Sequence, residues 1–353
     1  MKAHTLLILG SLVVATAGCK KSDSSTPAPA PAPGTAAPAP TPDPAAEAAA
    51  ARQKVADRLA KLDAEVATEA ARWTPELEAQ VVALRDGDYA TPVAALTAIL
   101  ASPHRLPGNA ARDQYRHPLE TLTFFGVEPT SRVVELGTGA GWYTEILAPL
   151  LAKRGALTAV GPNPDGPDDK MSRFYGQRLV KMLGKSAALY GAVTRVAIDP
   201  PGTLTLGPPG SADVVIAFRE MHNWVGAGQL AAYLTAIHAV LKDGGTFAFI
   251  DHRSAPDAKV EAVVEQGYLP EPWVIAQVTA AGFDLVAQAE INANPKDTKD
   301  YKEGVWTLPP ALALGEVDRD KYTAIGESDR MTLKFVKRAG GAAPAVAAPP
   351  SAK

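Results

Sequence analysis

Val133-Val134-Glu135-Leu136-Gly137-Thr138-Gly139-Ala140-Gly141 is the stretch that decides the fold: an apolar run, an acidic residue and then glycine at every second position. Glycine has no Cβ and tolerates positive φ, so such a loop turns sharply and lets its backbone approach a ligand closely. Residues 142–147 follow as a predicted helix start, which places the loop between a strand and a helix. The stretch predicts a nucleotide-type cofactor loop, and a bare tight turn in another α/β fold is the alternative. Because Glu135 lies two positions before the first glycine, the spacing suits S-adenosylmethionine better than a dinucleotide.

Strand and helix patterns alternate after this loop, which is typical of a mostly parallel, doubly wound sheet with helices on both faces. Further strands are predicted at residues 156–160, 193–198, 212–218 and 246–250, the last entered through a turn at 242–245, with 283–291 and 331–336 as a closing antiparallel pair. Helices are predicted at residues 46–73, from Thr74-Pro75, from Thr91-Pro92, near 109–125 and at 272–281. We therefore expect a Rossmann-like seven-stranded domain over 109–338, preceded by a helical extension over 46–108.

The first residues predict export. An apolar run at residues 6–17 follows Met1-Lys2 and is too short to span a bilayer permanently, as in a secretory signal peptide. Small residues lead into Cys19, the only cysteine, so residues 1–19 resemble a bacterial lipoprotein signal with Cys19 as the acylated N-terminus. An ordinary signal peptide with a leftover thiol is the alternative. We expect a cell-envelope lipoprotein on the periplasmic side of the inner or outer membrane.

Low-complexity segments flank the predicted folded part. Residues 20–45 are rich in Pro, Ala, Ser and Thr and cannot bury enough apolar surface to fold, so they are predicted to be a disordered tether. Residues 339–353 share this composition and are predicted to be a disordered tail. The net charge of −3 comes from interspersed charges of both signs, so nucleic acid is not an expected partner.

Five motifs resemble a family of bacterial predicted methyltransferases, within the class I S-adenosylmethionine-dependent enzymes. They are Arg116-His117-Pro118, the helix start with residues 141–149, Phe218-Arg219-Glu220-Met221-His222-Asn223-Trp224, residues 292–309 and residues 325–331. The resemblance covers about residues 113–337 and implies the cofactor S-adenosyl-L-methionine. It does not name the methyl acceptor, which we expect to be a small molecule or an envelope component.

The resemblance implies a set of cofactor-binding residues, which are Glu135, Gly137, Thr138, Gly139, Gly141, Trp142, Asn163 and Asp199. Many such enzymes bind the ribose through an acidic side chain after the second strand, but here residues 161–165 read Gly-Pro-Asn-Pro-Asp, so Asn163 or Asp165 would have to substitute. Asp199 stands where an acid often meets the adenine amine, and a simple turn opener is the equal alternative.

Chemistry is expected after the fourth strand, because ligands in open α/β sheets bind at the carboxyl ends of strands. Arg219, His222 and Asn223 follow that strand, and His222 is the candidate base because its ordinary pKa is near neutrality. A capping or core histidine is the alternative. His222, Asp251 and His252 lack the spacing of a strong zinc motif, so no metal is expected. Residues 292–300, with Trp306 beyond them, are predicted to cover the acceptor pocket, or else to be a solvated loop.

The expected compartment raises a second functional hypothesis. S-adenosylmethionine is made in the cytoplasm, whereas Cys19 places the domain outside the inner membrane. The first hypothesis is therefore a methyltransferase, and the second is a non-catalytic binding protein for a small ligand on a methyltransferase scaffold. The intact glycine motif favours the first, and the missing ribose acid favours the second.

Overall fold

The computed structural model describes residues 43–340. The predicted signal peptide, Cys19, the predicted tail after Gly340 and nearly all of the predicted tether lie outside these residues. The strands are β1 (Arg132–Leu136), β2 (Ala156–Pro162), β3 (Thr194–Ile198), β4 (Ala212–Phe218), β5 (Leu241–His252), β6 (Phe283–Ala289) and β7 (Arg330–Lys337). The longer helices are α1 (Pro44–Ala70), α2 (Pro75–Asp86), α3 (Pro92–Ala101), α5 (Pro118–Phe125), α6 (Thr144–Leu151), α7 (Met171–Leu183), α10 (Leu230–Val240) and α12 (Glu271–Ala280). The shorter ones are α4 (Asp113–Arg116), α8 (Ala187–Tyr190), α9 (Met221–Gly226), α11 (Val260–Val263) and α13 (Arg319–Ile325), with 3₁₀ turns at Ala110–Arg112, Val264–Gln266 and Gly304–Thr307.

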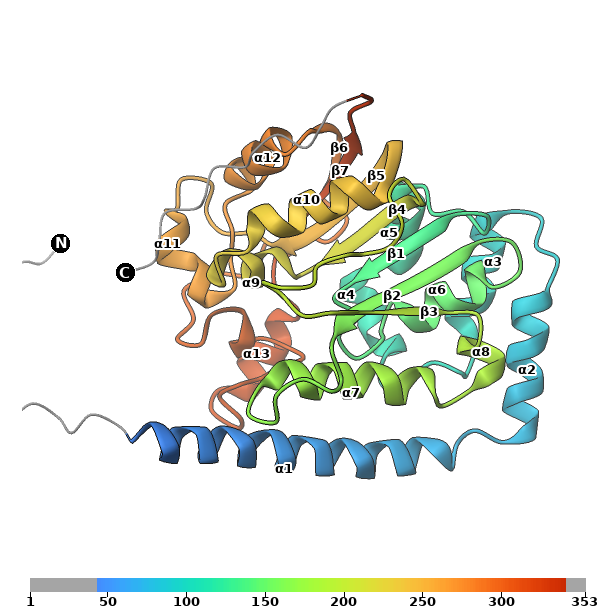
Figure 1. Ribbon diagram of the computed structural model, residues 1–353, viewed down its shortest axis with the longest axis horizontal. Helices are drawn as coiled ribbons and strands as arrows, with labels where there is room; N and C mark the ends of the chain where they lie inside the picture. Colours follow the sequence, from blue (N-terminus) through green and yellow to red (C-terminus); the bar gives the residue numbers. More distant parts are fainter. Residues whose placement is uncertain (1–42, 341–353) are drawn as a thin grey trace, which may run out of the picture. The chain divides into compact units, whose positions relative to one another are not determined.

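The strands form one seven-stranded sheet in the order β3-β2-β1-β4-β5-β7-β6 (Figure 1). Strands β1 to β5 pair in parallel, and β7 runs antiparallel to both of its neighbours. The predicted fold class, an α/β Rossmann-like sheet of seven mostly parallel strands after an N-terminal helical region, is confirmed. The order reverses at β1 and β4, so their carboxyl ends form the crevice where such sheets bind ligands.

The predicted helix over residues 109–125 is wrong as a single element. It is divided into a 3₁₀ turn, α4 and α5, and His117 between the two helices is left-handed with φ 41°. The following Pro118 explains the break, because a proline disfavours the α region for the residue before it and suits the first position of a new helix.

Other boundaries differ by smaller amounts. Helix α1 begins at Pro44, inside the segment predicted to be a tether, because Pro is compatible with the first turn of a helix. Strand β5 begins at Leu241, so the predicted turn at 242–245 interrupts the pairing of β5 with β4 instead of preceding the strand. Strand β6 ends at Ala289, two residues before its predicted end.

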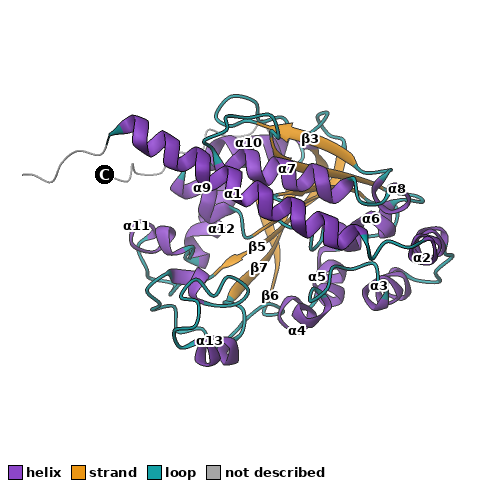
Figure 2. Cartoon of the chain, turned by 90° about the horizontal axis from the view of Figure 1, so that it is seen from below, coloured by secondary structure: helices purple, strands orange, loops and turns teal. Residues whose placement is uncertain are grey.

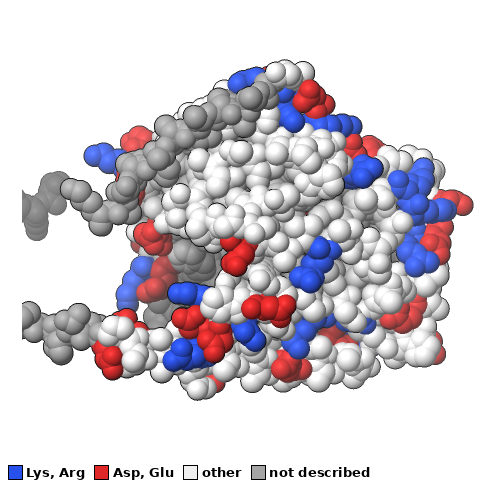
Figure 3. Space-filling model, viewed as in Figure 1, with Lys and Arg blue, Asp and Glu red and all other residues white. Residues whose placement is uncertain are grey.

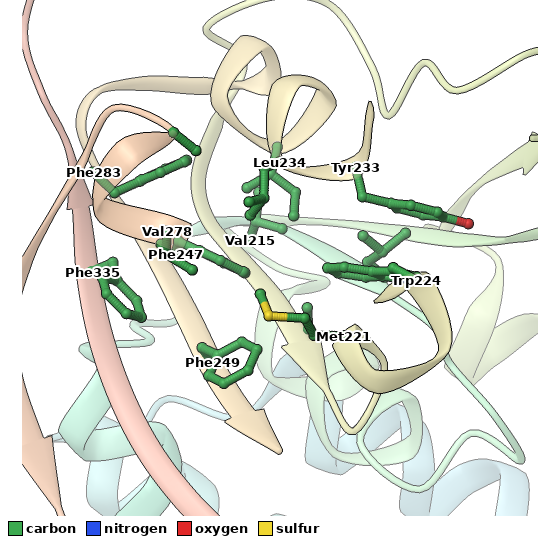
Figure 4. Packing of buried hydrophobic residues seen from close by; sticks show 14 of the residues in the cluster. Val215, Met221, Trp224, Tyr233, Leu234, Phe247, Phe249, Val278, Phe283 and Phe335 are labelled. Atoms are coloured by element: carbon green, nitrogen blue, oxygen red, sulfur yellow. The ribbon is translucent and has the colours of Figure 1, made fainter. Parts of the chain in front are cut away.

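Both faces of the sheet are buried. Successive side chains of a strand point to opposite faces, so Val215 joins a cluster beneath α9, α10 and α12, while Val214 and Ile216 join a second cluster on the other face. Figure 4 shows the first cluster, in which Trp224 of α9 stacks on Tyr233 of α10 with ring centroids 4.4 Å apart. This packing fixes α9, the helix that carries His222 and Asn223.

The N-terminal helices belong to the same compact unit as the sheet. Leu96 of α3 is fully buried in the cluster that contains Ile146 of α6 and Val214 of β4. Helix α1 lies along α7 (Figure 2), where Lys181 pairs with Asp63 at 2.7 Å. The predicted helical extension is therefore part of the core and not a separate domain.

Within residues 43–340, none of the helices combines the length and the apolar character that crossing a membrane requires. Figure 3 shows charged side chains of both signs scattered over the visible face, with large areas between them that carry no charged residue.

We predict that Leu96→Ala lowers the free energy of unfolding by about 2–5 kcal/mol, because it removes a fully buried side chain from the core shared with the sheet. Val93→Ala, at a position 45% exposed on the same helix, is the matched control and should change it by less than about 0.5 kcal/mol. Urea unfolding of the full chain measures both. Equal effects of the two variants would contradict the assignment of α3 to the core.

Candidate functional site

A cavity of about 240 Å³ lies where β1 and β4 end. Six of the predicted site residues line it: Glu135, Gly137, Thr138, Gly139, Trp142 and Arg219. Its other lining residues include Arg112 and Arg116, from the segment before β1, and Arg178 of α7.

The three glycines of the loop are all left-handed, with φ of 77°, 58° and 81° at Gly137, Gly139 and Gly141. A Cβ added at Gly139 would meet open space, with the Gly137 carbonyl oxygen 4.0 Å away. A Cβ at Gly141 would collide with the side chain of Met182, so this glycine is required by packing against α7 and does not line the cavity. A Cβ at Gly137 would collide with the carboxyl group of Glu220. The loop is thus open to a ligand at Gly139 and bordered by Glu220 at Gly137.

Glu135 forms the floor of the cavity and is 4% exposed. Thr144 Oγ1 donates a hydrogen bond of 2.7 Å to Glu135 Oε2, but burial outweighs it and raises the pKa of Glu135 to about 8. Burial likewise raises the pKa of Glu220 to about 8. Both acids next to the glycine loop are therefore largely protonated near neutral pH.

Three arginines converge on the buried carboxylate of Glu327. Arg112 Nε and Arg116 Nε lie 2.7 and 3.0 Å from its oxygens, and Arg330 Nη1 lies at 2.8 Å. Burial alone would raise the pKa of Glu327, but Arg116, Arg330 and Arg112 outweigh it and lower the pKa to about 2. The carboxylate is ionised at any physiological pH, and it holds two arginines of the cavity wall in place.

Arg219 directly follows β4 and is left-handed, with φ 62°, which is uncommon for a residue with a side chain. Its backbone N–H donates to Ile250 O at 2.6 Å, so the strained turn is tied to β5. This turn directs the chain from the sheet into α9, and Arg219 is the predicted catalytic residue that lines the cavity.

His222 is 5% exposed and pairs with Asp251, the last but one residue of β5. Its Nδ1 lies 2.9 Å from Asp251 Oδ1, and its backbone N–H donates to Asp251 Oδ2 at 3.2 Å. Burial alone would lower the pKa of His222, but the Asp251 carboxylate outweighs it and raises the pKa above its ordinary value. Because Nδ1 is held by Asp251, Nε2 is the atom left to accept a proton from a substrate.

Several predicted residues lie outside the cavity wall. The Asn163 side chain accepts a hydrogen bond from Asp165 N, so it stabilises the loop in which it lies. Asp199 is exposed, and its carbonyl accepts from Gly202 N and Thr203 N, which is the turn that the alternative interpretation predicted. Asn223 is exposed and hydrogen-bonds to Glu220. The wall contains none of these side chains, nor that of His222.

Residues 292–300, which were predicted to cover the acceptor pocket, are hydrogen-bonded to the rest of the domain. Asn292 is buried, and its amide donates to Thr121 and Thr332 at 3.1 Å. Asp297 is also buried and accepts from Tyr268 Oη, so a fully solvated loop is wrong. Trp306 lies beyond, 41% exposed, with its ring centroid 6.3 Å from that of His222.

His222, Asp251 and His252 meet in space although their sequence spacing does not predict a metal site. Their potential ligand atoms all lie within 4.8 Å of one another. However, Asp251 Oδ1 already accepts from both His222 Nδ1 and the His252 backbone N–H. Burial, followed by the charges of His222 and Arg219, lowers the pKa of His252 well below its ordinary value, so the surroundings disfavour added positive charge. The arrangement suits proton transfer better than cation binding.

Sequence reasoning missed five groups at this site, namely Arg112, Arg178, Glu220, Glu327 and Arg330. Glu220 and Glu327 stand inside motifs that had been singled out, so their residue types were visible but their partners were not. Arg178 is on α7, where no motif marks it.

Comparisons with known proteins show fold likeness. No protein-family model matches the chain, and a comparison with curated proteins gave no match. Among solved structures, an SAM-dependent methyltransferase from Aquifex aeolicus is 16% identical, with a TM-score of 0.42 over 64% of this chain and 93% of that one. The [4+2]-cyclase SpnF is also 16% identical, with a TM-score of 0.41 over 64% and 81%. The glycopeptide N-methyltransferase MtfA, solved with S-adenosylhomocysteine, is 16% identical, with a TM-score of 0.40 over 64% and 90%.

We predict that Asp251→Asn lowers the pKa of His222 below 6.5, because burial then acts without the opposing carboxylate. Histidine ring resonances followed by NMR across pH measure this shift. His104, whose pKa burial lowers to about 4, is an internal reference, and the exposed Asp284→Asn is the control variant. A His222 pKa that stays above 6.5 in Asp251→Asn would show that another group sets it.

Proposed function

We propose that the protein is an S-adenosylmethionine-dependent methyltransferase whose acceptor is unidentified. The observation that carries the proposal is the glycine loop between β1 and α6, which lines a cavity at the carboxyl ends of β1 and β4 and leaves open space at Gly139. The residues present fit the methionine end of the cofactor, since Gly137, Thr138 and Gly139 expose backbone there. A cavity of about 240 Å³ is smaller than the ~300–1,000 Å³ typical of ligand sites, so it fits only part of the molecule.

Gly137, Thr138 and Gly139 would hold S-adenosylmethionine, which would supply a methyl group on a sulfonium for transfer to the acceptor, with the electron pair of the C–S bond left on sulfur. The chain must therefore orient the acceptor and remove its proton. We assign proton removal to His222 Nε2, with Asp251 fixing the ring, and orientation to Arg219 and Asn223. Because the pKa of His222 is raised, the neutral base becomes more populated as pH rises through that pKa.

One observation favours the alternative of a non-catalytic binding protein. No acidic side chain from the end of β2 lines the cavity, since Asn163 lies outside the wall and Asp199, after β3, is exposed. A ligand without a ribose would not need such an acid.

We further propose that the protein is anchored in the cell envelope through lipid at Cys19. The motif and the apolar run before it support this proposal. A transferase in that compartment would act on an envelope component or a small molecule and would depend on cofactor supplied from the cytoplasm.

We predict that Gly139→Val abolishes binding of S-adenosylhomocysteine, because the added side chain would occupy the open space beside the loop. Calorimetry on the full chain measures binding. Gly210→Val is the matched control, since Gly210 also has positive φ, at 65°, and open space around it but lies outside the cavity lining. The control should bind normally. If the unmutated chain does not bind S-adenosylhomocysteine at millimolar concentration, the proposal of a methyltransferase is overturned and the non-catalytic binding protein is favoured.

We predict that Cys19→Ser moves the protein from the membrane fraction to the soluble fraction. Several acyl chains on a processed lipoprotein cysteine hold a protein stably, whereas one chain does so only marginally. Fractionation and immunoblotting measure the distribution, with Ser22→Ala as the control in the same segment. Retention of Cys19→Ser in the membrane would show that another feature anchors the chain.

A further inference from the structure

The cavity carries an excess of buried positive charge. Arg112, Arg116 and Arg330 share the single carboxylate of Glu327. Arg219, on the same wall, forms no ion pair within residues 43–340. Glu135 and Glu220 offset little of this charge, because burial keeps both largely protonated near neutral pH.

Buried guanidinium nitrogens at this site lack hydrogen-bond partners. Arg112 Nη2, Arg116 Nη1 and Arg330 Nε are buried and have no partner within the described residues. Arg116 as a whole is only 3% exposed. Leaving a buried donor unpaired is unfavourable, and more so for a charged group. Arg112 and Arg116 both line the cavity, so their guanidinium groups are suited to an acceptor that a ligand brings.

S-adenosylmethionine alone does not neutralise the excess positive charge of the cavity. S-adenosylmethionine carries a sulfonium and an ammonium against one carboxylate, so its net charge is positive, and it adds to the excess on the arginines. Its carboxylate can pair with one guanidinium at most in a bidentate manner. A second, anionic molecule would offset the excess positive charge of the loaded site.

We propose that the methyl acceptor is an anion whose carboxylate or phosphate group binds Arg112, Arg116 and Arg219 on the wall of this cavity, while the rest of the acceptor lies outside it. The proposal rests on the proposed function, because it names the substrate class of the same site. Arginine is suited to this role, since its planar donors match carboxylate and phosphate oxygens. Arg219 lies three residues before His222, so an anion held there places the rest of the acceptor toward the His222 and Asp251 pair.

The test titrates the full chain with inorganic phosphate and, separately, with acetate, at constant ionic strength, with and without saturating S-adenosylhomocysteine. We expect at least one of the two anions to bind in both conditions. Arg219→Gln removes a charge without breaking an ion pair and should weaken anion binding at least tenfold, a larger change than it causes in binding of S-adenosylhomocysteine. Arg195→Gln removes the same charge from an exposed position of β3 and should change neither affinity.

A second measurement compares the sulfonium cofactor with its neutral product. The bound anion should strengthen binding of S-adenosylmethionine more than binding of S-adenosylhomocysteine, because only the former carries the extra positive charge. Competition between the anion and S-adenosylhomocysteine would assign the arginines to the cofactor carboxylate and overturn the proposal. Failure of both anions to bind, with S-adenosylhomocysteine bound, would overturn it too. Anion binding without S-adenosylhomocysteine binding would instead overturn the proposed function and leave an anion site.

Discussion

The Glu327 carboxylate is the group on which the geometry of the site depends. It joins Arg112 and Arg116, which precede the sheet, to Arg330 at the start of β7, across more than 200 residues of sequence. Its own backbone carbonyl accepts from Asn294, so the anchored segment after β6 meets the same point. Breaking one partner of a buried ion pair commonly costs about 3–5 kcal/mol, because the other charge is left unpaired. The wall of the cavity is therefore fixed by ionic contacts at a place where apolar packing ends.

The same physical cause, burial, has opposite outcomes for the carboxyl groups of this site. Glu135 and Glu220 have no nearby cation strong enough to offset desolvation, and their pKa values rise to about 8. Glu327 is equally enclosed, yet three guanidinium groups lower its pKa to about 2. The result is a cavity with a protonated floor and a cationic wall. Such a cavity binds an anion without first having to expel a carboxylate of its own.

The sequence predicted the sheet well because its strands are short apolar runs separated by turn signals, and both signals are local. His117-Pro118 also carried a local signal, the restriction before proline, which the apolar periodicity of residues 109–125 obscured. The arginine cluster was not predictable in this way. Arg112 and Glu327 are 215 positions apart, and no spacing rule relates them. The pairing of His222 with Asp251 was predictable in part. The topology places both residues at the carboxyl ends of the neighbouring strands β4 and β5, but it does not specify which imidazole nitrogen bonds to Asp251.

Glu220 connects the glycine loop to the candidate base. Its carboxyl group borders Gly137, and it is one of the groups that raise the pKa of His222. A ligand that binds against Gly137 must either bond to this carboxyl group or displace it. Where Glu220 is ionised, displacement would remove a negative charge that favours the protonated imidazole, so the pKa of His222 would fall. Occupation of the loop and activation of the base are thus linked through one side chain, although His222 does not line the cavity.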